Sequence, residues 1–117
     1  MTTKYTVAIG NNVEVPIKFT LKEGRVNKAF AYTLLAERRE AADIEAAMKD
    51  NEYKFKEALL SLGCVTGWVG QKLILEEDGK TPAEFNDEAF GAMLSIPVVA
   101  AIVFQSYQKE CGAKEKN

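Results

Sequence analysis

The feature that most constrains the fold of this chain is a strict alternation of residue character from Val13 to Leu21. Successive side chains of a β-strand point to opposite faces, so the alternation collects five apolar side chains on one face and leaves charged residues, a threonine and Pro16 on the other. Pro16 has no amide hydrogen and favours an edge strand, or a site where that amide would face outward. The pattern therefore predicts a half-buried strand.

A second alternating run follows a polar turn. Lys22–Arg25 supplies the turn and includes a glycine, and Phe30, Tyr32 and Leu34 then share a face with smaller residues between them. Two alternating runs separated by a short turn predict an antiparallel β-hairpin. Tyr5–Ile9 also alternates, and we interpret it as either a third short strand or an ordered arm.

Helical spacing dominates the rest of the chain. Asp50 and Asn51 offer an N-cap for a helix that would end at Gly63, a residue suited to a left-handed C-cap. Asn86 is a second candidate N-cap, and Pro97 is tolerated at the first position of the last helix. The pattern predicts helices over residues 36–49, 52–62, 89–94 and 98–110, with a brief strand at 73–75.

Length and composition indicate one domain. The chain has 117 residues, of which 47% are hydrophobic and 27% charged. Area scaling gives a folded surface of roughly 6,300 Å² against about 18,700 Å² unfolded, so a core can form without a metal or a disulfide. We predict a single α+β domain over residues 1–111, with an N-terminal antiparallel β-hairpin or small sheet packed against three to four α-helices, and a charged C-terminal tail over 112–117.

The sequence contains no histidine. It therefore lacks the commonest general base and the commonest metal ligand, and its serines have no imidazole to activate them. Cys64 and Cys111 are too few for a zinc-ligand spacing, and we expect buried thiols, with a disulfide between them as the open alternative. These observations predict a protein that is not an enzyme and that holds no metal and no cofactor.

Net charge and hydropathy limit the classes of partner that we expect this protein to bind. The net charge is −2, and the adjacent basic pair Arg38-Arg39 is followed at once by Glu40, so no basic stripe for nucleic acid is formed. The apolar run Ile96–Phe104 is far shorter than the roughly 20 residues that span a bilayer, and Met1–Tyr5 lacks the apolar stretch of a signal peptide. We expect a soluble cytoplasmic protein that binds neither nucleic acid nor a membrane.

Binding to another protein is the remaining expectation. The candidate features are the strand edge near Pro16, the glycine-flanked segment around the single tryptophan, and the apolar last helix. For the tryptophan and for the last helix, packing inside the core is the competing interpretation. The strand edge and the last helix also allow a homo-oligomer. We predict that the partner-binding residues are Trp68, Val69, Phe85, Ile102 and Tyr107.

The order of several segments carries a resemblance to a known family. Val15–Lys22 opens the hairpin, an acidic and alanine-rich helical stretch follows, and Val65–Gln71 comes next. The second half adds Glu77–Phe85, a helix with Met93 and Leu94 before Pro97, a closing helix that ends in Tyr107, and the tail 112–117. From about Val13 onward, this order resembles the small tail assembly chaperones of long-tailed bacteriophages.

The resemblance implies a non-enzymatic virion morphogenesis factor of a phage or prophage, acting in the host cytoplasm. Proteins of this family coat the long helical tape measure protein, keep it soluble and help to recruit tail tube subunits. The implied partners are therefore the tape measure protein and the tail tube protein, and no catalytic or ligand residue carries over. Two alternatives stay open: a structural virion component, such as a tail tube or head-tail joining protein, and a small protein-binding regulator.

Overall fold

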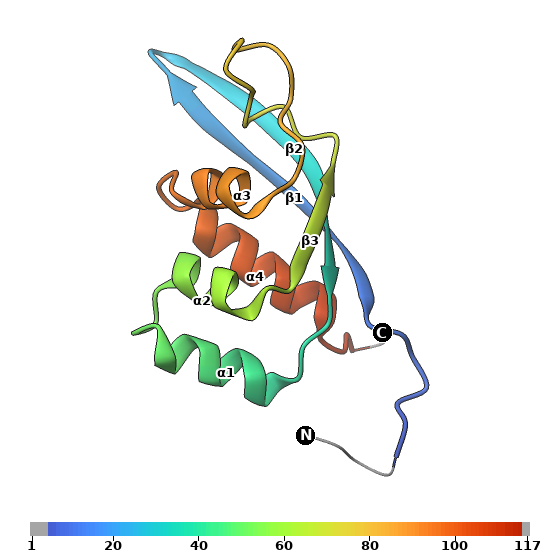
Figure 1. The fold of residues 1–117 in the computed structure, drawn as a ribbon. Coiled ribbons are helices and arrows are strands. Elements are labelled where there is room, and N and C mark those ends of the chain that lie inside the picture. The colour runs from blue at the N-terminus through green and yellow to red at the C-terminus, as the bar shows by residue number, and fades with distance from the viewer. Residues whose placement is uncertain (1–4, 116–117) are drawn as a thin grey trace.

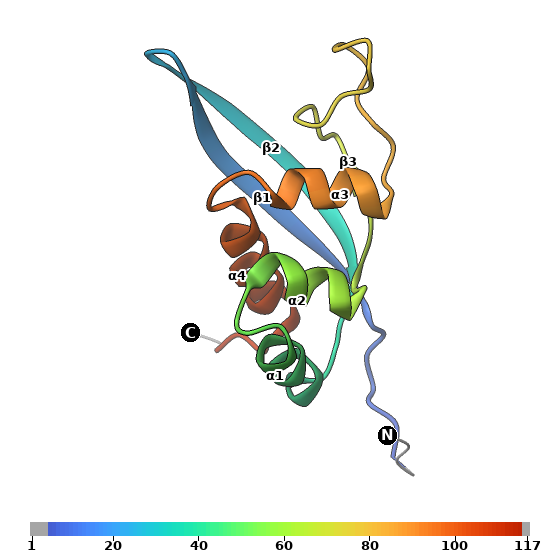
Figure 2. The same cartoon turned by 60° about the vertical axis from the view of Figure 1, so that its left-hand side comes forward.

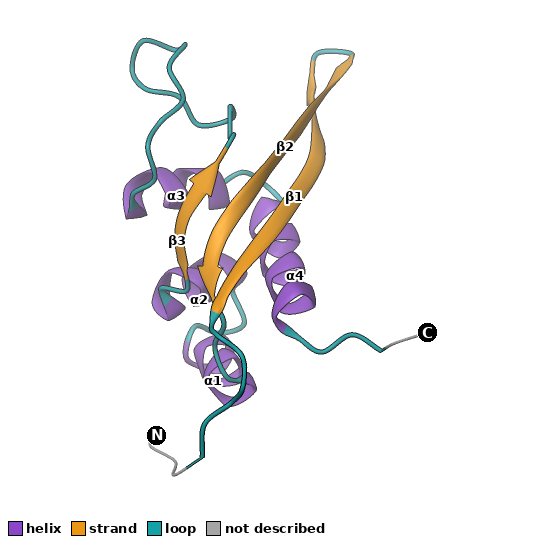
Figure 3. Ribbon diagram, turned by 90° about the vertical axis from the view of Figure 1, so that its right-hand side faces the viewer, coloured by secondary structure: helices purple, strands orange, loops and turns teal. Residues whose placement is uncertain are grey.

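A computed structural model describes residues 5–115 as a three-stranded antiparallel sheet with four helices on one side of it (Figure 1, Figure 3). Residues 1–4, where the absence of an apolar leader was expected, and residues 116–117 of the predicted tail lie outside this description. The predicted α+β architecture, with an N-terminal sheet packed against helices, is confirmed.

The predicted hairpin is present and is longer than expected. Strand β1 spans Asn12–Glu23 and strand β2 spans Val26–Glu37. The two strands pair antiparallel around a turn in which Gly24 has a φ of 63°, a conformation that favours glycine. The sheet order is β1-β2-β3, so β1 is an edge strand and the edge position expected for Pro16 is confirmed.

Of the two interpretations of Tyr5–Ile9, the structure shows the arm, and the third strand lies elsewhere in the chain. Residues 5–11 form an arm without strand pairing, and strand β3 spans Val65–Val69 and pairs with β2. Gly67 lies opposite Leu35, and a Cβ at Gly67 would lie 3.3 Å from Leu35 Cδ1, so a side chain there would crowd the sheet. The predicted strand at 73–75 is reduced to an isolated bridge, Leu75 with Pro82.

The core lies between the inner face of the hairpin and helix α4, Val99–Cys111. Helix α4 packs on β1, α2 (Phe55–Leu62) packs on α4, and α1 (Ala41–Asp50) packs on α2 (Figure 2). Helix α3 (Asp87–Leu94) contacts both α2 and α4. The most deeply buried large side chains come from both layers: Val15, Ile17, Leu34, Leu59, Met93, Val99, Val103 and Tyr107.

Two predicted helix starts are wrong. The chain from residue 36 continues β2 to Glu37, so α1 begins only at Ala41. Asn51 does not cap α2 but ends α1, because its side-chain Nδ2 donates to the Ala47 carbonyl at 2.7 Å. Glu52 and Tyr53 then have positive φ values of 56° and 61°, which no helix can include, and α2 starts at Phe55.

Other helix ends agree with the sequence pattern. Gly63 ends α2 with a φ of 57°, and Asn86 caps α3 by accepting a hydrogen bond from the Ala89 amide at 2.7 Å.

Pro97 is not the first residue of the last helix, because the turn that separates α3 from α4 runs through Val98, whose φ is 73°. The axes of α3 and α4 differ by 108°, and this turn accommodates the change of direction.

The chain is more extended than its mass requires. Its accessible surface is 8463 Å², about a third more than the roughly 6,300 Å² expected for a compact protein of this size. Its radius of gyration is 15.6 Å, against about 13.4 Å for a compact domain of the same length. The tip of the hairpin and the N-terminal arm both project beyond the helices and contribute to this surface (Figure 2).

Replacing the α3 cap tests whether this short helix is stabilised locally. Asn86→Ala removes the acceptor for the Ala89 amide, so the free energy of unfolding should fall by about 1 kcal/mol in a urea titration. Asn27→Ala, an exposed change in β2, should move it by no more than about 0.5 kcal/mol. Equal effects of the two variants would contradict a capping role for Asn86.

Candidate functional site

An open apolar groove of about 690 Å³ lies between α1 and α4. Because α1 reaches α4 mainly through α2, the two helices diverge and leave a space between their facing sides. The walls of this groove are formed by Ile44 and Met48 from α1 and by Phe104 and Cys111 from α4, and the exposed ring of Tyr53 lies at one end. We call this hollow the α1/α4 groove.

Charged residues line the other end of the α1/α4 groove. Arg38 and Arg39 lie there with Glu40, and Glu45 stands farther along α1. The Arg38 guanidinium ties two segments together, since its Nη1 donates to the Gly10 carbonyl at 2.8 Å and its Nε donates to the Cys111 carbonyl at 2.9 Å. The Arg38 guanidinium therefore holds Gly10, at the base of the N-terminal arm, next to Cys111 at the end of α4.

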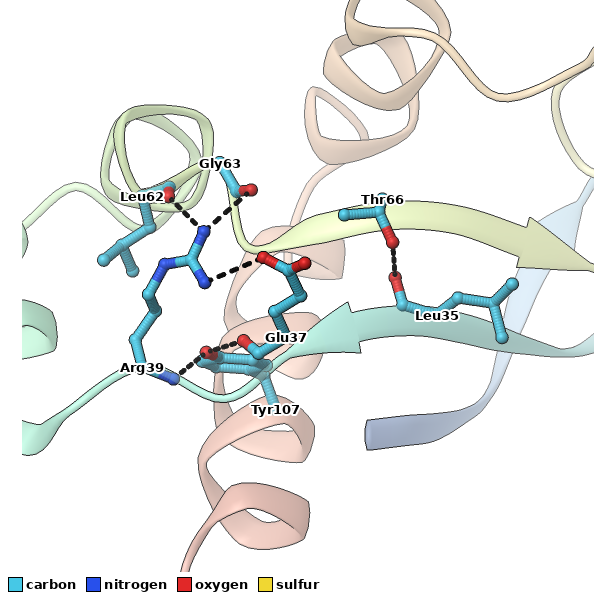
Figure 4. Close-up of polar contacts among 7 residues, drawn as sticks. All are labelled: Leu35, Glu37, Arg39, Leu62, Gly63, Thr66 and Tyr107. Atoms are coloured by element: carbon cyan, nitrogen blue, oxygen red, sulfur yellow. Dashed lines mark hydrogen bonds and ion pairs between the residues drawn. The ribbon is translucent and has the colours of Figure 1, made fainter. Parts of the chain in front are cut away.

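Arg39 makes a second set of contacts within the chain (Figure 4). Its Nη1 lies 3.1 Å from Glu37 Oε1, and its Nη2 donates to the carbonyl oxygens of Leu62 at 3.4 Å and Gly63 at 3.3 Å. These contacts join the end of β2 to the end of α2. The groove end is thus preorganised by bonds that the two arginines make to main-chain and side-chain oxygens.

Tyr107 completes this corner from the inside. Its hydroxyl donates to the Glu37 carbonyl at 2.7 Å and accepts from the Arg39 amide at 3.0 Å, where β2 leaves the sheet (Figure 4). Burial raises the pKa of this hydroxyl, which therefore stays protonated and able to donate. Burial also raises the pKa of the neighbouring Cys64 and Cys111 thiols, and both cysteines are free.

The predicted partner-binding residues do not form one surface. Trp68 and Phe85 meet edge to face with ring centroids 5.1 Å apart, whereas Val69 points to the opposite face of β3 and is 58% exposed. Ile102 is a half-buried residue of α4 packed against the core. Tyr107 is fully buried, so its predicted contact with a partner is not supported: its side chain holds the fold together instead.

The segment that carries Phe85 is held by a residue that the sequence did not single out. Gln71 is buried, and its Oε1 accepts hydrogen bonds from the amides of Leu73 and Ile74 at 3.1 and 2.8 Å. Its Nε2 donates to the carbonyls of Ile74 and Ala83, and Trp68 Nε1 also donates to Ala83 at 3.1 Å. These bonds make the Trp68–Phe85 contact part of the packed structure, which fits the core interpretation of Trp68.

The α1/α4 groove itself was missed by sequence reasoning. The only signal in the sequence was that α1 has a narrow apolar face, formed by Ile44 and Met48, which are four residues apart. Such a face is too small for a helix to pack against neighbours on two sides. In the structure, one side of this apolar face packs on α2, and the remainder lines the groove. No pattern in the sequence indicates that α4 turns Phe104 and Cys111 toward the same space.

The chemistry available in this site is that of apolar contact. Within residues 5–115, no group of three or more cysteine, aspartate or glutamate side chains is placed to hold a metal ion. In the same part of the chain no single helix is long and apolar enough to cross a membrane, and α3 and α4 pass that test only as a pair bent by 108°.

Comparison of the chain with protein-family models, with curated proteins and with solved structures finds no match.

Removing the Tyr107 hydroxyl tests its role at the groove corner. Tyr107→Phe leaves the partly buried Glu37 carbonyl and Arg39 amide without this partner, so the free energy of unfolding should fall by about 1–2 kcal/mol. The exposed Tyr53→Phe is the matched control and should change it by less than about 0.5 kcal/mol. A Tyr107→Phe protein as stable as the control would show that the hydroxyl bridge does not support the fold.

Proposed function

We propose that this protein is a non-enzymatic tail assembly chaperone, which binds a tape measure protein, keeps it soluble and helps to recruit tail tube subunits. The observation that supports the proposal is the α1/α4 groove, an open apolar hollow on a small acidic protein. An apolar groove between two helices suits the apolar face of a third helix, which is the kind of segment that a long helical client exposes.

The dimensions of the groove agree with this kind of client. Helix α1 has 10 residues and is about 15 Å long, which matches two to three turns of a guest helix. Anchors at positions i, i+3 or i+4 and i+7 of the guest would pack on Met48 and Tyr53, above the buried Phe104. Many copies bound along one client would add their affinities, so no single contact has to be strong.

The surface assigned to the client differs from the one expected from the sequence. The accessible apolar residues of the groove are Met48 and Tyr53, above a floor formed by the buried Ile44 and Phe104. They take the place of Tyr107, which is buried, and of the Trp68–Phe85 pair, whose rings pack against one another. The exposed Glu40 and Glu45 side chains offer negative charge to a guest helix at the rim of the groove. Of the two alternatives, a small protein-binding regulator would use the same groove, so the identity of the client decides between them.

Co-expression with a tape measure protein tests the proposal. The wild-type chain should keep the client in the soluble fraction and co-purify with it. Met48→Glu places a charge in the groove wall and should weaken client binding by about tenfold or more, because that carboxylate must be desolvated beneath the guest.

The matched control is Ala46→Glu, which adds the same charge to an exposed part of α1 outside the groove. It should solubilise the client as the wild-type chain does, and urea unfolding should confirm that both variants fold. A client that stays insoluble with the wild-type chain would refute the chaperone proposal. Equal client recovery with both variants would refute the groove as its site.

A further inference from the structure

The sheet has a second face, on the side away from the four helices (Figure 3). Side chains that alternate with the buried ones point to this face, which we call the outer sheet face. Two of its apolar side chains are exposed, Leu35 at 37% and Val69 at 58%. The outer sheet face is formed by Glu14, Pro16, Lys18, Ala29, Ala31, Thr33, Leu35, Gly67 and Val69.

A row of paired residues crosses the middle of the outer sheet face. Pro16 of β1 pairs with Thr33 of β2, and Thr33 pairs with Val69 of β3. Residues directly opposite one another in a sheet have their side chains on the same face, so this row crosses all three strands. None of its side chains is charged. We call these three residues the central row.

Charges are balanced about the central row. Glu14 lies two residues before Pro16 and Lys18 two residues after it, about 7 Å away on either side. Neither side chain forms an ion pair within residues 5–115. A twofold axis along the central row would place Glu14 of one copy opposite Lys18 of a second copy, at two equivalent points. The face is therefore complementary in charge to itself, as a contact between identical copies requires.

Side-chain size is balanced about the central row in the same way. Leu35 lies two residues after Thr33 and Ala31 lies two residues before it. Leu35 is exposed, whereas Ala31 lines two open hollows of about 470 and 350 Å³. The same twofold axis would seat Leu35 of each copy over the hollows beside Ala31 of the other. One axis thus satisfies both the charges and the shape of the face.

We propose that two copies of this chain associate through their outer sheet faces, about a twofold axis along the central row. Two sheets that pack face to face lie about 10 Å apart, which leaves room for side chains of this size to interdigitate. The inference goes beyond the proposed function, because the outer sheet face shares no residue with the α1/α4 groove. The helices stay on the outside of this dimer, so it offers two grooves to one long client.

Sedimentation equilibrium of the full chain measures this association. The wild-type chain should form dimers, and Val69→Asp should raise the dissociation constant at least tenfold, because two carboxylates then meet on the axis. Val26→Asp is the matched control, since Val26 is 62% exposed, also belongs to a strand and lies beside the hairpin turn, far from the central row. A wild-type chain that is monomeric throughout, or equal dissociation constants for the two variants, would overturn the proposal.

Charge reversal tests the arrangement of the two copies. Glu14→Lys alone and Lys18→Glu alone each place like charges opposite one another at two points, so each variant should dimerise at least tenfold more weakly than the wild type. An equimolar mixture of the two variants brings opposite charges together at both points and should form a heterodimer. Single variants as dimeric as the wild type, or a mixture that stays monomeric, would show that the copies do not meet about this axis.

Client recovery with the same proteins separates this inference from the proposed function. Val69→Asp should lose the dimer and still keep the client soluble, whereas Met48→Glu should lose the client and remain dimeric. If Val69→Asp stayed dimeric while Met48→Glu lost the client, the sheet-face dimer would fail and the proposed function would stand. If Val69→Asp lost the dimer while Met48→Glu kept the client, the proposed client site would fail and the dimer would stand.

Discussion

The structure depends on the burial of one face of the hairpin against α4. Alternation along β1 and β2 places Val15, Ile17 and Leu34 on the inner face, where they are almost completely removed from water. Helix α4 meets this face with Val99 and Val103, and the remaining helices are placed by their contacts with α4 or with α2. Burial of this kind is not directional, so hydrogen bonds must set the orientation of the layers.

Hydrogen bonds of two buried tyrosine hydroxyls fix the orientation of the helices relative to the sheet. Tyr107 bridges the Glu37 carbonyl and the Arg39 amide, and so fixes α4 to the point where β2 ends. Tyr32 donates to the Met93 sulfur at 2.9 Å and connects the centre of the sheet to α3. Burial raises the pKa of both hydroxyls, so they remain protonated donors. The same Tyr107 corner lies between the end of β2 and the start of α1.

Predictions from the sequence were most successful where the interactions are local. The alternation within each hairpin strand, the Gly63 cap and the Asn86 cap depend on residues within a few positions of one another, and the hairpin and both caps are confirmed. The sequence pattern left a strand and an arm open for Tyr5–Ile9 and did not predict β3 over Val65–Val69, because only packing decides which segment pairs with β2. Tyr107 was predicted to bind a partner, with packing inside the core as the competing interpretation, because the spacing of apolar residues in a helix does not indicate whether its own chain or a partner covers them.

The sequence by itself determined an α+β fold with an N-terminal hairpin and a composition without histidine. It could do so because alternation, helical spacing and residue chemistry are local properties. Only the tertiary structure decided that α1 and α4 diverge around α2, that Gln71 locks the segment before α3, and that the arm stands away from the helices. These features involve contacts between residues far apart in the chain. Their geometry depends on three-dimensional packing, which the spacing of apolar residues in the sequence does not indicate.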